Sequence, residues 1–97
     1  MQEIKLLLIL LISNFLFWGC ASIQEAESLY KKGDKEAALN MAISLLDKDD
    51  PGVRLRAVRL IGKVGGEKAG SALRMRIRDA DSKVQKEVIK NLGKIQY

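Results

Sequence analysis

The sequence predicts an all-α protein: an α–α superhelix, in the form of a short α-solenoid of about five helices, that follows an N-terminal signal peptide. Three observations lead to this prediction. After residue 20 the chain has a single proline and no alternating apolar pattern long enough for a strand. The same part repeats its residue types at a fixed offset of 31 residues, a period typical of stacked helical pairs. Residues 1–19, in contrast, form an apolar leader.

The leader has the layout of a secretory signal peptide. Lys5 and the N-terminal amine are positive, and residues 6–18 are apolar except for Ser13 and Asn14. A helix of that length spans roughly 20 Å, which is too short for a bilayer hydrocarbon core of about 30 Å. We therefore interpret residues 1–19 as a removable signal rather than as a transmembrane helix.

The leader ends in Phe17-Trp18-Gly19-Cys20, a motif that resembles the bacterial lipobox. The resemblance implies cleavage between Gly19 and Cys20, with diacylglycerol on the Cys20 sulfur and an acyl group such as palmitate on its new amine. The alternative is that Cys20 is an ordinary small residue at the end of an uncleaved anchor. We favour the lipoprotein, because the only cysteine of the chain stands where the apolar run stops. The next two residues include no aspartate, so the resemblance favours the outer membrane, at its periplasmic face, over the inner membrane.

Helical spacing of apolar residues predicts helices at about residues 23–32, 35–46, 51–64, 67–78 and 82–95. The first helix ends at Gly33, and Asp34 is placed to cap the second.

The later helix boundaries have equally local signals. The third helix starts at Asp50-Pro51, with aspartate as the N-cap and proline at the first helical position, and two glycines end it. We expect Met75 and Ile77 of the fourth helix to face the core. Asp81 opens the fifth helix.

The 31-residue offset superimposes the third helix on the fifth and the second on the fourth. Ten positions agree in type, among them Asp50 with Asp81, Val53 with Val84, Ala57 with Val88 and Gly62 with Gly93. These stretches resemble short HEAT repeats. The resemblance implies two HEAT-like repeats at 35–97, after the lipidated N-terminus and first helix at 20–34. The first hairpin is either tetratricopeptide-like or begins with a generic capping helix, and both alternatives keep the fold class.

The HEAT resemblance also assigns roles to single residues. In such repeats an aspartate caps the second helix, and the arginine after the valine reaches an aspartate of a neighbouring repeat. Asp50, Asp81 and Arg54 match this pattern. Gln85 stands where the second arginine belongs, which implies that the last repeat is a terminal, capping repeat.

Charge is unevenly distributed along the chain, whose net charge is +5. Residues 20–52 carry a net charge of −3 and residues 53–97 a net charge of +8. Cations recur at helical spacing and form a candidate basic face of Arg56, Arg59, Lys63, Lys90 and Lys94. Such a face is either a solvated helix surface or a site for anions.

Composition excludes several function classes. The chain has no histidine and one cysteine, so it has no imidazole base, no internal disulfide and no histidine or cysteine metal cage. The aspartates between the helices are expected to be caps rather than metal ligands, and no cofactor is expected. Residues 20–97 contain no phenylalanine or tryptophan to stack on bases, so we do not expect a nucleic-acid partner.

The sequence therefore indicates a non-catalytic, membrane-anchored module for protein–protein interaction or scaffolding in the bacterial cell envelope. Its partners are the membrane, through the lipid anchor, and an unknown envelope protein. The alternative is a module that binds envelope polyanions through its basic face.

Overall fold

The structure is a computed structural model that describes residues 22–95. Within that range the chain forms α2 (Ile23–Lys31), α3 (Lys35–Ser44), the 3₁₀ helix η1 (Leu45–Asp47), α4 (Pro51–Val64), α5 (Gly66–Arg74) and α6 (Ser82–Ile95), and it has no strand. The predicted all-α class is confirmed. Gly19 and Cys20 lie outside the described residues, so the lipobox stays a prediction. None of the helices within 22–95 has both the length and the apolar character needed to cross a membrane.

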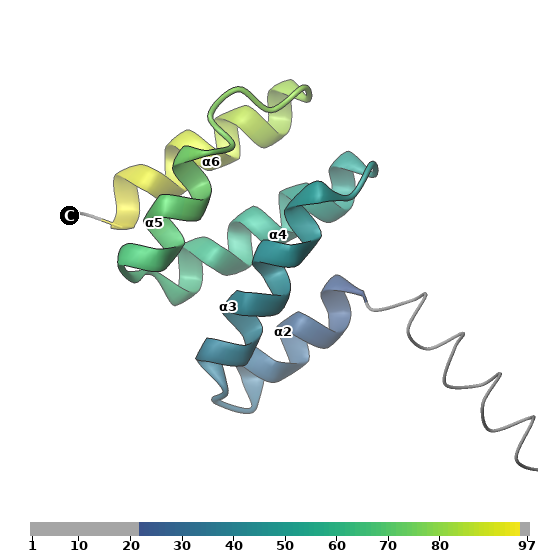
Figure 1. Cartoon of the computed structure of the whole chain (residues 1–97), viewed down its shortest axis with the longest axis vertical. Helices are drawn as coiled ribbons and strands as arrows, with labels where there is room; N and C mark the ends of the chain where they lie inside the picture. The colour runs from purple at the N-terminus through teal and green to yellow at the C-terminus, as the bar shows by residue number, and fades with distance from the viewer. Residues whose placement is uncertain (1–21, 96–97) are drawn as a thin grey trace, which may run out of the picture.

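The helices are arranged in two layers, as Figure 1 shows. One layer contains α2, α4 and α6, and the other contains α3 and α5. The central helix α4 packs against all four other α-helices. Because the pair α5–α6 repeats the arrangement of the pair α3–α4, the predicted α-solenoid is confirmed.

The 31-residue register is visible in the burial of the core. Ala26, Ala57 and Val88 are each 0% exposed, and they hold the same place in α2, α4 and α6. Ala38 and Ala69 are likewise fully buried at equivalent places in α3 and α5. Alanine at four of these five positions lets neighbouring helices approach closely. Helix α2 therefore follows the same register as the second helix of each repeat.

Three aspartates stand at helix N-termini and accept hydrogen bonds from backbone N–H groups. Asp34 accepts from Ala37 N at 3.2 Å, and Asp50 accepts from Gly52 N at 2.8 Å. The carboxylate of Asp81 accepts from the first turn of α6, with Lys83 N at 2.9 Å and Val84 N at 3.1 Å. These bonds satisfy donors that have no partner inside a helix, so they fix where α3, α4 and α6 begin.

The expected fourth helix was wrong at its C-terminal end. Helix α5 ends at Arg74, and residues 75–78 form turns. Here Arg76 N bonds to Leu73 O at 2.9 Å, three residues back instead of four, which tightens the chain. Met75 is consequently 86% exposed and Ile77 is 43% exposed, rather than facing the core.

Candidate interaction surface

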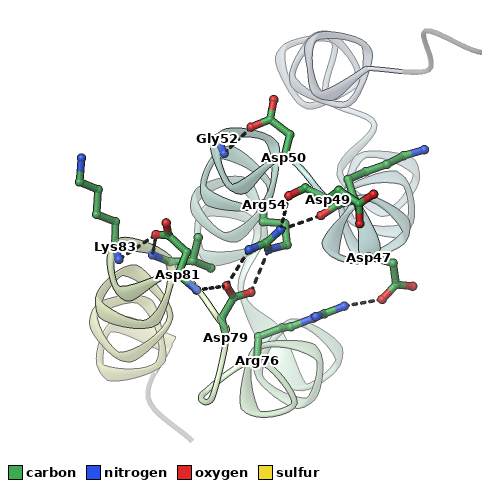
Figure 2. Close-up of polar contacts among 11 residues, drawn as sticks. Asp47, Asp49, Asp50, Gly52, Arg54, Arg76, Asp79, Asp81 and Lys83 are labelled. Atoms are coloured by element: carbon green, nitrogen blue, oxygen red, sulfur yellow. Dashed lines mark hydrogen bonds and ion pairs between the residues drawn. The ribbon is translucent and has the colours of Figure 1, made fainter.

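The guanidinium of Arg54, a residue of α4, contacts both the loop before α4 and the loop before α6, as Figure 2 shows. From α4, its Nε and Nη2 donate to the two carboxylate oxygens of Asp79, both at 3.0 Å. Its Nη1 donates to the carbonyl oxygens of Lys48 at 2.8 Å and Asp49 at 2.9 Å. The arginine therefore ties the loop before α4 to the loop before α6, which belongs to the next repeat.

Asp79 is the buried partner in this contact, with a side chain only 2% exposed. Its Oδ1 also accepts from Asp81 N at 2.9 Å. Burial by itself raises the pKa of the Asp79 carboxyl, but the hydrogen bonds from Arg54 and Asp81 N, together with the positive charges of Arg54 and Arg76, outweigh burial and hold the pKa below its ordinary value. The same hydrogen bond raises the pKa of Arg54. The carboxylate is thus kept ionised and fully engaged, which makes it an inter-repeat clamp.

Further polar contacts also run between units of the array. Arg76 pairs with Asp47 of η1, and Lys68 of α5 donates to Asn40 of α3. In the other layer, Arg59 of α4 lies 3.2 Å from the Glu87 carboxylate of α6. Arg56 of the same helix pairs with Glu27 of α2. Each unit of the register is therefore joined to its neighbour by charged or polar side chains as well as by the core.

A family model for HEAT repeats matches residues 23–97. The chain belongs to the HEAT-repeat family. The match starts at α2, so the first hairpin is included in it together with the two repeats. No curated protein and no solved structure matches the chain.

In the folded HEAT repeats, part of the positive charge of the candidate basic face is paired with carboxylates. Arg56 and Arg59 are paired with glutamates of neighbouring helices. Lys63, Lys90 and Lys94 are exposed and make no ion pair with a residue in the described range. Exposed lysines also run along α6, and we call them the α6 lysine row: Lys83, Lys86, Lys90 and Lys94. Of these three lysines of the predicted basic face, Lys90 and Lys94 lie on α6 and Lys63 lies on α4.

One apolar side chain on the outer side of α6 was not among the predicted site residues. Ile89 of α6 is 60% exposed, whereas Val58, its equivalent on α4, is 0% exposed. A capping repeat requires a polar outer face, and Ile89 is an apolar exception among the exposed lysines of α6. The signal was present in the sequence, because Ile89 lies outside the apolar stripe formed by Val84, Val88 and Leu92.

The loop aspartates of the HEAT repeats do not form a metal site in the part of the chain that the structure describes. No group of three or more potential ligands occurs there. Asp50 and Asp81 cap helices, while Asp47 and Asp79 pair with arginines. These carboxylates are thus occupied by contacts that hold the fold.

Proposed function

We propose that this HEAT-repeat chain is a lipid-anchored, non-catalytic scaffold module that binds a protein partner in the bacterial cell envelope. HEAT repeats typically bind proteins and typically lack catalytic activity. One observation supports the proposal most directly: Ile89 is 60% exposed at a position where the preceding repeat buries its equivalent completely. Stacked repeats cover one another, so a position that is covered on α4 and open on α6 is suited to a contact with another protein.

The anchoring part of the proposal rests on the lipobox. Processing at Gly19 and Cys20 would attach two or three acyl chains to the new N-terminus, and each buried CH₂ contributes about 0.8 kcal/mol. That attachment is far stronger than the hold of one myristoyl chain. Helix α2 begins at Ile23, so the folded part would follow the membrane almost directly. The periplasmic face of the outer membrane is our proposed location.

Replacing the lipobox cysteine tests the anchor. We expect Cys20→Ser to leave an uncleaved precursor that takes up no labelled fatty acid, because serine has no thiol to receive the diacylglyceryl group. The measurement is metabolic acyl labelling, together with the size of the protein in membrane fractions. Ser22→Ala, two residues away, is the matched control and should be processed normally. Lipid labelling of Cys20→Ser at the mature size would show the lipobox assignment to be wrong.

Photo-crosslinking from position 89 tests the scaffold role. A photoreactive amino acid in place of Ile89 is expected to capture a specific envelope protein in living cells, because this side chain already faces outward. The same probe at Ser28, an exposed position on α2, is the control. Mass spectrometry identifies the adduct, and tagging the captured protein should recover this chain in return. Equal capture from both positions, or none from position 89, would contradict the proposal.

Binding of envelope polyanions is a second candidate function, and the α6 lysine row favours it. Four lysines follow one another along the exposed side of a single helix. Their exposure makes any such binding strongly dependent on salt. The ion pairs of Arg56 and Arg59 reduce the charge available on the predicted face, so a protein partner remains our first proposal. A polyanion would leave position 89 without a protein adduct.

A further inference from the structure

Three features of the surface of helix α4 lie where α6 packs on it. Val58, one residue before Arg59 and four residues before Gly62, is fully buried. Gly62 allows a close approach, because a Cβ atom there would lie 2.0 Å from Asn91 Oδ1 of α6. Arg59 stands beside them, with its Nε 3.2 Å from Glu87 Oε1 of α6. An apolar side chain, a glycine and a cation thus make the docking face for the next helix.

Helix α6 carries the same three features 31 residues later, on its own outer side. We call them the outer α6 face: Ile89, Lys90 and Gly93. Ile89 and Lys90 are exposed, and a Cβ atom at Gly93 would meet nothing within 4 Å. Glycine is among the least favourable residues inside a helix, and here no contact within the described residues accounts for it. The outer α6 face thus has the same kinds of residue as the surface of α4 that packs against α6. No helix within residues 22–95 covers it.

We propose that the outer α6 face binds an acidic amphipathic helix of a partner protein, in the place that α6 takes on α4. This inference rests on the proposed scaffold function and names the chemistry of its partner. The α6 lysine row borders the face, so carboxylates on the incoming helix are favoured. A symmetric pair of α6 helices is disfavoured, because it would bring two lysine rows into one interface.

The contacts of α6 on α4 also define the pattern of the partner helix. A carboxylate would face Lys90, as Glu87 faces Arg59. Four residues further on, a side chain would cover Gly93, as Asn91 covers Gly62. Apolar residues between these positions would cover Ile89. This pattern describes one face of a parallel helix, since both pairs advance in the same direction along their helices.

A peptide derived from α6 itself provides the probe. It has the sequence of residues 82–95 with four lysines of the α6 lysine row changed to glutamate, so that the face formed by Val84, Glu87, Val88 and Asn91 is retained. Its binding to the full chain in detergent micelles is measured by fluorescence anisotropy at low salt. We expect at least tenfold tighter binding than for the unaltered, basic peptide. A scrambled peptide of the same charge should bind as weakly as the basic one.

Variants of the chain locate the binding site. They also distinguish binding at the outer α6 face from an exchange in which the peptide replaces α6 on α4. We expect Ile89→Asp and Gly93→Leu each to weaken binding of the acidic peptide at least tenfold, with circular dichroism unchanged. Lys90→Glu should also weaken it, and a peptide with lysine at the position of Glu87 should restore binding. Lys35→Glu, at an exposed position of α3, is the matched charge control and should change affinity less than twofold.

Three results would overturn the inference. The first is that the full chain binds the acidic peptide no more tightly than the basic one. The second is that Ile89→Asp and Gly93→Leu bind the acidic peptide as tightly as the unsubstituted chain does. The third is that the full chain associates with itself and that these variants abolish the association. The last result would assign the face to a second copy. If position 89 still captures an envelope protein in cells while the acidic peptide does not bind, the scaffold function stands and only the acidic helix is refuted.

Discussion

Asp79→Ala is expected to destabilise the fold by about 3 kcal/mol, because it removes one partner of a buried ion pair and leaves the other without a countercharge. Asp79 is 2% exposed and Arg54 is 12% exposed, so water cannot easily replace the lost contact. The substitution also removes the acceptor of Asp81 N at the start of α6. In a domain of this size the melting temperature should fall by roughly 10–20 °C.

Thermal and urea unfolding followed by circular dichroism measures this loss. Asp47→Ala is the matched control, because Asp47 also pairs with an arginine of the neighbouring repeat but its side chain is 86% exposed. Exposed ion pairs typically contribute less than about 1 kcal/mol. If Asp79→Ala costs no more stability than Asp47→Ala, the buried clamp is not the main polar contact between the repeats.

The same ion pair should make stability depend on pH in the acid range. Because the pKa of Asp79 is lowered in the folded state, the unfolded chain takes up this proton at the higher pH. The stabilisation is complete above the ordinary aspartate pKa of about 4 and is lost as the pH falls through the folded-state pKa. Asp79→Asn should flatten this part of the stability profile. A profile identical to that of the unsubstituted protein would show that other carboxylates determine the acid sensitivity.

Gly62→Ala is expected to cost about 2 kcal/mol or more, because the added methyl group overpacks the contact between α4 and α6. The new Cβ would lie 2.0 Å from Asn91 Oδ1 and 2.9 Å from Asn91 Cβ. A rotation of the Asn91 side chain cannot relieve the second contact, so the two helices must move apart. Asn91 is buried, and its Nδ2 donates to Glu87 O at 2.7 Å, which further restricts its movement.

Gly93→Ala is the matched control for this prediction. It is the same substitution at the equivalent position of α6, where nothing lies within 4 Å of the added atom. Alanine favours a helix over glycine by up to about 1 kcal/mol, so Gly93→Ala should leave stability unchanged or raise it. The double variant Gly62→Ala/Asn91→Ala should lose less than the sum of the single losses, because both residues act on one contact. Equal effects of the two glycine substitutions would contradict the close approach at Gly62.

Local signals in the sequence were sufficient for most helix boundaries. Asp50 with Pro51, and Asp81, cap helices through hydrogen bonds to residues two or three positions away, so neighbouring residues alone determine them. The end of α5 could not be obtained in this way. Met75 and Ile77 continue an apolar pattern, but the turn at 75–78 places them outside the core. That turn leads the chain to Asp79, whose partner Arg54 is 25 residues away.

The features of the candidate site can likewise be sorted into those that the sequence determines and those that depend on tertiary packing. The sequence by itself determined the helical class, the 31-residue register and the lipobox prediction at Cys20, because each depends on residue types at fixed spacing. Only the tertiary structure decided that Arg56 and Arg59 pair with glutamates and that Ile89 and Gly93 have no neighbouring helix within residues 22–95. A periodic sequence specifies which positions are equivalent, but not how far one repeat rotates on the next. That rotation determines which charges meet and which of the equivalent positions within residues 22–95 stays exposed.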